Sequence, residues 1–134
     1  VSKNLKELVG ANLVTHEEVG NLVLYQADIK SVLLRQLKIC LTLLDLIDLI
    51  RNLDPFMTGG ILYGSCATGE DTSESDSDLF IISREKSRVL NEIRKEAGGM
   101  KREIKAVVVS GEEYLLMRNK KEELLDELNK GVVL

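Results

Sequence analysis

The longest apolar stretch of the chain covers residues 31–53, and it predicts a single helix. Ser31 can cap the start of this helix, and Asp54-Pro55 ends it. Charged residues interrupt the stretch every three to seven positions, which excludes a membrane span because each would be costly in hydrocarbon. Apolar residues still lie on more than one side of this helix, and each apolar side has to be buried. We therefore expect a homodimer through this helix, or else a further domain that packs against it. The residues expected to face the partner are Leu37, Leu41 and Leu44.

A short helix and a hairpin are predicted before the long helix. Residues 2–9 carry apolar side chains at helical spacing and end at Gly10. Strand-like runs at 13–14 and 22–25 flank a turn at Gly20-Asn21. A segment of this length is too short to form a hydrophobic core of its own.

The remainder of the chain alternates strand and helix patterns. Apolar runs at 60–63, 78–83 and 103–109 predict strands, and residues 84–98 have helical spacing. Ser110 begins a capping-box pattern for a last helix, expected to run to about residue 130 before a final strand. This order predicts an α/β (α+β) fold with helices packed on a small sheet. The predicted divisions are a helix-and-hairpin unit at 1–30, a linking helix at 31–54 and a sheet domain at 55–134.

Composition removes several classes of function. The 134 residues carry a net charge of −4, which argues against a protein that coats nucleic acid. Two cysteines and one histidine allow neither a disulfide framework nor a zinc cluster. We assign His16 no role and interpret Cys66 as a small filler. No signal segment follows the first residue, so we expect a cytoplasmic protein with reduced thiols.

A glycine-containing turn and a pair of carboxylates stand out between the first two strands of the sheet domain. Gly64-Ser65 follows a strand and opens a short helix, where free N–H groups and a hydroxyl favour a phosphate. Asp76 and Asp78 are two apart at the start of the next strand, so both carboxylates share one face. Such a pair can hold one or two Mg²⁺ ions together with substrate phosphates. An acidic, serine-rich loop is by itself solvated surface, but beside a phosphate turn it indicates a nucleotide site.

The motif GSCATG…SDSDLFII resembles the Gly-Ser…Asp-x-Asp signature of the DNA polymerase beta-like nucleotidyltransferase superfamily, above all its minimal nucleotidyltransferases. The resemblance implies a mixed β-sheet flanked by helices. It implies that Gly64 and Ser65 hold the phosphates of a nucleoside triphosphate, with ATP the first candidate. It further implies that Asp76 and Asp78 bind Mg²⁺ or Mn²⁺ and catalyse nucleotidyl transfer to a hydroxyl acceptor.

The chain departs from this family pattern at one position. Catalytic members carry a third acidic residue on the strand after the metal pair, and here Lys105 stands in its place. Glu103 lies on the same face two residues earlier and could replace that acid only after a register shift. Lys105 would repel a metal but could neutralise a phosphate, so nucleotide binding is better supported than catalysis. Besides transfer, the chain could be a degenerate nucleotide-sensing module attached to a DNA-binding domain, or an antitoxin that binds a partner toxin.

Residues 4–28 (NLKELVGANLVTHEEVGNLVLYQAD) resemble the end of a winged helix-turn-helix domain, with the tail of a recognition helix and a two-strand wing. They also resemble archaeal proteins that join such a domain to a nucleotidyltransferase domain through a long helix. A plain hairpin packed on the core would give the same pattern. DNA binding is expected only of the full-length protein, because a wing alone cannot read a major groove.

Overall fold

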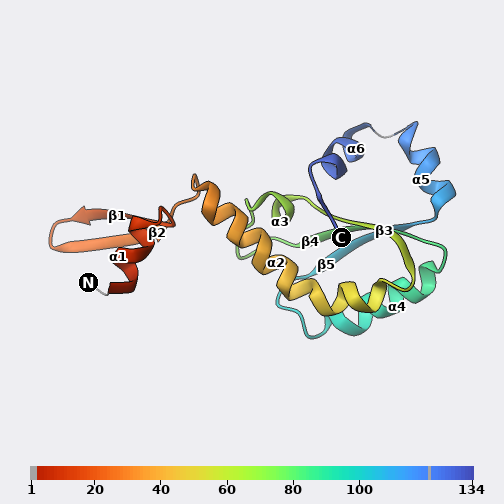
Figure 1. Cartoon of the computed structure of the whole chain (residues 1–134), viewed down its shortest axis with the longest axis horizontal. Helices are drawn as coiled ribbons and strands as arrows, with labels where there is room; N and C mark the ends of the chain where they lie inside the picture. Colours follow the sequence, from red (N-terminus) through yellow and green to blue (C-terminus); the bar gives the residue numbers. More distant parts are fainter. Residues whose placement is uncertain (1–2, 121) are drawn as a thin grey trace.

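The computed structural model describes residues 3–120 and 122–134, with a helix and a hairpin followed by a long helix and a layered unit (Figure 1). The N-terminal elements are α1 (Lys3–Gly10), β1 (Val14–Val19) and β2 (Leu22–Ala27). The long helix is α2 (Val32–Leu53). The layered unit contains β3 (Met57–Tyr63), α3 (Ser65–Thr68), β4 (Ser77–Ser83), α4 (Lys86–Ala97), β5 (Ile104–Val109), α5 (Gly111–Arg118), α6 (Glu122–Asn129) and β6 (Val132–Val133). The predicted fold class is confirmed: helices flank a small mixed sheet after a hairpin and a long helix.

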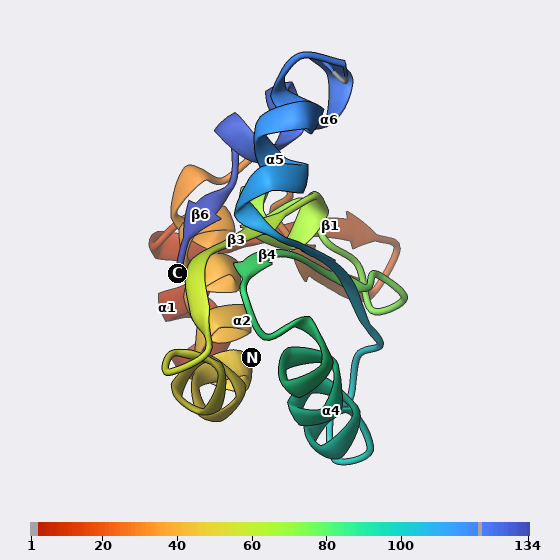
Figure 2. The same ribbon diagram turned by 90° about the vertical axis from the view of Figure 1, so that its right-hand side faces the viewer.

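The sheet of the layered unit has the strand order β5-β4-β3-β6. Strands β4 and β5 run parallel, whereas β3 is antiparallel to both β4 and β6. Helices α2 and α4 lie on one face of the sheet, and α5 and α6 lie on the other (Figure 2). Because side chains alternate along a strand, each strand supplies both faces.

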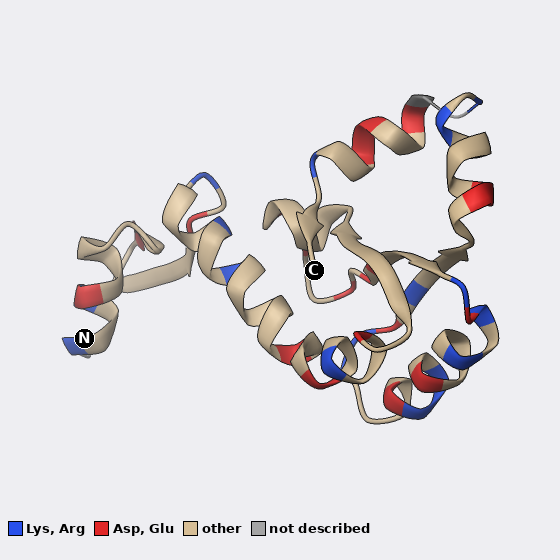
Figure 3. Cartoon of the chain, turned by 45° about the vertical axis from the view of Figure 1, so that its right-hand side comes forward, with Lys and Arg blue, Asp and Glu red and all other residues tan. Residues whose placement is uncertain are grey.

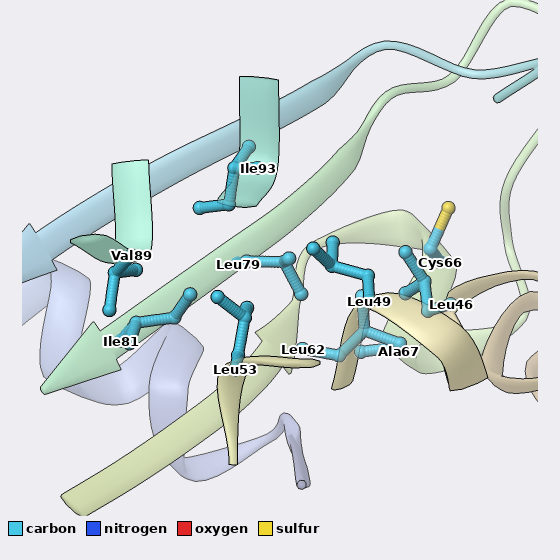
Figure 4. Packing of buried hydrophobic residues seen from close by; sticks show 10 residues of the cluster. All are labelled: Leu46, Leu49, Leu53, Leu62, Cys66, Ala67, Leu79, Ile81, Val89 and Ile93. Atoms are coloured by element: carbon cyan, nitrogen blue, oxygen red, sulfur yellow. The ribbon is translucent and has the colours of Figure 1, made fainter. Parts of the chain in front are cut away.

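The core on the first face is formed mainly by α2, α4 and the two central strands. Leu46, Leu49 and Leu53 of α2 meet Leu62 of β3 and Leu79 of β4 (Figure 4). These five leucines are almost fully buried. Burial of one such side chain contributes about 2 kcal/mol, so the C-terminal half of α2 is fixed to the sheet.

The second face corrects one expectation, because the single helix predicted from Ser110 to about residue 130 is two helices, α5 and α6. Phe80 of β4 packs with Tyr114 from α5 and with Leu128 from α6. On one straight helix, residues 114 and 128 would lie about 21 Å apart along the axis and could not share this contact. Packing onto the sheet therefore favours a bend over one continuous helix.

The helices that follow Ser31 and Ser110 begin at the predicted caps. The first strand of the four-stranded sheet, β3, begins earlier than predicted. The Ser31 hydroxyl accepts a hydrogen bond from the Leu34 N–H at 3.2 Å. Ser110 and Glu113 form both bonds of the capping box. Strand β3 starts at Met57, not at residue 60, and its register against β4 shifts beside Met57. No helix in the described part of the chain is long and apolar enough to cross a membrane.

The N-terminal segment has no core of its own, as its length predicts. No residue from 3 to 30 is buried. Strands β1 and β2 pair antiparallel, with Val19 opposite Leu22 across the predicted Gly20-Asn21 turn. The apolar side chain of Leu22 is 66% exposed.

Candidate functional site

The turn between β3 and α3 brings main chain against a carboxylate. Gly64 has φ +74°, a conformation that side chains with a Cβ rarely adopt. A Cβ added at Gly64 would lie 2.6 Å from Oδ2 of Asp78, which is closer than van der Waals contact. Both conditions explain why glycine occupies this position. Ser65 follows as the first residue of α3, so its N–H and that of Cys66 have no partner within the helix.

The two predicted carboxylates lie beside this turn. Asp78 is in β4, opposite Tyr63 of β3 and Lys105 of β5. Asp76 stands one residue before β4, and its Oδ2 atom lies 2.5 Å from Nζ of Lys105. The structure therefore brings Gly64, Asp76, Asp78 and Lys105 together at one end of the sheet, on the face that also carries α5 and α6.

Charge at this end of the sheet is mixed. Burial raises the pKa of the Asp78 carboxyl above its ordinary value, Lys105 opposes this shift, and Asp76 and Glu127 add to it. A hydrogen bond to Asp76 raises the pKa of the Lys105 ammonium above its ordinary value, and the negative charge of Asp76 adds to this rise. Burial raises the pKa of the Tyr63 phenol, and the carboxylates of Asp78 and Glu127 raise it further.

Glu103, the sequence-predicted candidate for a third acid, stands one residue before β5. Its carbonyl accepts a hydrogen bond from the Ser77 N–H at 2.9 Å, so its backbone is beside the carboxylate pair. Glu103 is exposed, and its charge adds to the rise in the pKa of Lys105. The observed pairing places Lys105, not Glu103, opposite Asp78.

A charge network around the buried Asp71 anchors the loop that joins α3 to Asp76. Asp71 is 4% exposed, and its Oδ2 accepts a hydrogen bond from Arg102 at 2.6 Å. Arg102 also donates to Sγ of Cys66 at 2.8 Å, and that thiol donates to the carbonyl of Asp76 at 3.3 Å. Lys38 of α2 donates to the Asp71 carbonyl and lies 3.6 Å from its Oδ1 atom. The network fixes the loop from two sides.

Sequence reasoning missed this network, and it also missed Tyr63 and Glu127. Arg102 and Asp71 are 31 residues apart, and no motif relates them. Arg102 lies in a run of charged residues, Lys101 to Glu103, and nothing in that run distinguishes it as a partner of Asp71. Cys66 is fully buried, in agreement with its interpretation as a filler, and it also links Arg102 to Asp76.

The donor set fits one divalent cation. Mg²⁺ is commonly held by one or two carboxylates together with substrate phosphates, and Asp76 and Asp78 meet that requirement. Among residues 3–120 and 122–134, no three His, Cys, Asp or Glu side chains gather where they could hold a metal ion by themselves. Two carboxylates leave the other coordination positions of a divalent cation to water and substrate oxygens.

Comparison with known families agrees with this geometry. A family model described as a nucleotidyltransferase domain matches residues 45–132. No curated protein matches the chain in sequence. The matched region begins within α2 and includes the turn, both carboxylates and the sheet. Because the match covers more than half of the chain, the protein belongs to the nucleotidyltransferase domain family.

Proposed function

We propose that this domain binds a nucleoside triphosphate, with ATP as the first candidate, together with Mg²⁺ or Mn²⁺. The observation that carries the proposal is the contact between the Gly64 turn and the Asp78 carboxylate. The main chain at Gly64 can approach an anion such as a phosphate, and the Asp78 carboxylate beside it can bind a cation. Membership of the nucleotidyltransferase domain family supports the same interpretation.

Each side chain has a distinct part in this proposal. The N–H groups at the turn and the hydroxyl of Ser65 donate to phosphate oxygens. Asp76 and Asp78 accept the divalent cation, which neutralises phosphate charge when bound. Lys105 lies beside both carboxylates and can reach a phosphate because its side chain is 58% exposed.

Transfer of the nucleotidyl group to a hydroxyl acceptor is the second candidate, and family membership favours it. It needs a group that takes the proton of the acceptor, and Glu103 is the remaining candidate for that role. A nucleotide-sensing module attached to a DNA-binding domain and an antitoxin would both use the same binding step. Lys105 favours the sensing module over transfer because an ammonium cannot accept a proton.

Calorimetry tests the binding proposal. The wild-type chain should bind ATP with Mg²⁺, and a double variant with Asp76→Asn and Asp78→Asn should lose the metal-dependent part of the affinity. The matched control is Glu17→Gln with Glu18→Gln, which removes two carboxylates from the exposed hairpin and should bind as the wild type does. Unchanged ATP affinity in the Asp76 and Asp78 double variant would refute the assignment.

A labelling experiment separates binding from transfer. The chain is incubated with α-labelled nucleoside triphosphates and Mg²⁺, and both pyrophosphate and labelled protein are measured. Release of pyrophosphate that depends on Glu103 would support transfer. Binding without release would support the sensing module.

A further inference from the structure

The cation of Lys105 occupies the space beside the carboxylate pair. Its Nζ atom lies 2.5 Å from Oδ2 of Asp76, and its backbone is the register partner of Asp78. Both strands are held by continuous parallel pairing from Ser77–Ile104 to Ile82–Val109, so this neighbourhood is set by the sheet. The sheet therefore fixes the backbone of Lys105 beside the carboxylate pair, while its side chain is 58% exposed.

Charge decides how many divalent cations this arrangement can hold. Sites with two metal ions place them about 3.5–4 Å apart, so carboxylates and substrate phosphates together have to offset four positive charges. Asp76 and Asp78 supply two negative charges, and Lys105 already offsets one of them. A second divalent ion beside Lys105 would meet an ammonium of like charge, whereas one ion can use both carboxylates and the substrate phosphates.

Resting on the nucleotide-binding function proposed above, we propose that the Lys105 ammonium substitutes for a second divalent cation. One ammonium carries the same net charge as a divalent ion bound to one carboxylate. Compared with a two-metal site that has a third carboxylate, a site with Lys105 therefore keeps its attraction for a triphosphate. It lacks one metal ion and the carboxylate that could accept a proton. The site then takes one divalent cation per nucleotide, and Lys105 forms a charge-assisted hydrogen bond to the phosphates.

Counting bound metal tests this inference without a measurement of catalysis. Wild-type protein and ATP are titrated with Mn²⁺, and bound Mn²⁺ is counted by electron paramagnetic resonance. We expect one Mn²⁺ per bound nucleotide in the wild type. Lys105→Asp should bind a second Mn²⁺, because the new carboxylate lies in register with Asp78.

Affinity provides the second measurement. Lys105→Met should weaken ATP binding at least about tenfold while adenosine binding stays the same, because the lost contact is to phosphate. Lys105→Arg should keep most of the affinity because it keeps the charge. Lys95→Met removes an equivalent charge from the exposed face of α4 and should have no effect. Circular dichroism verifies that each variant is folded.

The possible failures can be told apart. If wild-type protein does not bind ATP at any Mn²⁺ concentration, the proposed function is wrong and this inference is wrong with it. If ATP binds with two Mn²⁺ ions, or if Lys105→Met leaves the ATP affinity unchanged, the nucleotide site stands and the substitution by Lys105 is overturned.

Discussion

One side of α2 remains exposed although it is apolar, and we propose that a second copy of the chain covers it. The residues of this side, which we call the outer seam, are spaced alternately by four and three positions, as in a coiled coil. They lie on the opposite side of the helix from Leu46 and Leu49, which face the sheet. Figure 3 shows an uncharged stretch of α2 between its basic and acidic parts. The outer seam consists of Leu33, Leu37, Cys40, Leu44 and Ile47, with Leu41 beside it.

The exposed fractions of the seam leucines set the free energy that dimerisation can gain. Leu37, Leu41 and Leu44 are 43%, 60% and 60% exposed. Covering a half-exposed leucine gains about 1 kcal/mol, so a seam of this size on two copies gains about 10 kcal/mol. Association itself costs about 4–15 kcal/mol. The dimer is therefore expected to be weak enough for one charge per chain to dissociate it.

The perturbation is Leu44→Glu, which places a carboxylate from each copy in the seam. We expect the dissociation constant to rise at least about hundredfold, equivalent to about 3 kcal/mol, measured by sedimentation. Leu115→Glu is the matched control because Leu115 is 59% exposed on α5, and this variant should sediment as the wild type does.

A cross-linking assay tests the same seam directly. Cys40 is at the midpoint of the seam. It therefore lies opposite Cys40 of the second copy if the helices pair parallel and in register, and also if they pair antiparallel about the centre of the seam. A short bismaleimide should link the wild type through Cys40, because Cys66 is fully buried. Cys40→Ser should abolish the link. A wild-type chain that is monomeric at micromolar concentration and forms no link would refute the dimer.

Three further variants test the remaining contacts of the fold and site. Arg102→Met should lower the free energy of unfolding by about 3 kcal/mol, because it removes a partner of the buried Asp71 carboxylate. Urea unfolding measures this loss, and an unchanged midpoint would contradict the prediction. Gly64→Val should weaken ATP binding more than adenosine binding, whereas Gly98→Val, at a position with open space, should not. An equal loss for ATP and adenosine would make the turn structural only. Ser110→Ala should cost about 1 kcal/mol in thermal unfolding because α5 loses its cap, and no loss would show that the capping box is dispensable.

Local signals in the sequence were sufficient for most elements. Ser31 and Ser110 marked helix starts because a cap needs only a side chain three residues before its N–H partner. Gly64 was identified from its place between a strand and a polar loop, and its positive φ agrees with that reasoning. The family pattern puts Lys105 at the position of the third acid, and in the sheet Lys105 is the register partner of Asp78.

Other features depended on contacts between distant segments. The apolar pattern of α2 predicted that several sides are buried, but only the position of the sheet distinguishes Leu46 from Leu44. The bend between α5 and α6 follows from Phe80, which lies on a strand far earlier in the chain. The ion pair of Asp71 with Arg102 has no characteristic spacing, because two folded segments bring the partners together. Such contacts carry no periodic signal.

Different partners hold the backbone and the side chain of Asp76, and this difference bears on how the site can bind a ligand. The Asp76 carbonyl is tied to the buried thiol of Cys66, which Arg102 in turn contacts. The carboxylate instead meets Lys105, whose side chain is more than half exposed. In the nucleotide complex proposed above, a cation and a phosphate would therefore rearrange the Lys105 contact while the loop stays fixed. Because the loop is already ordered, binding does not have to order it, and that lowers the free-energy cost of binding.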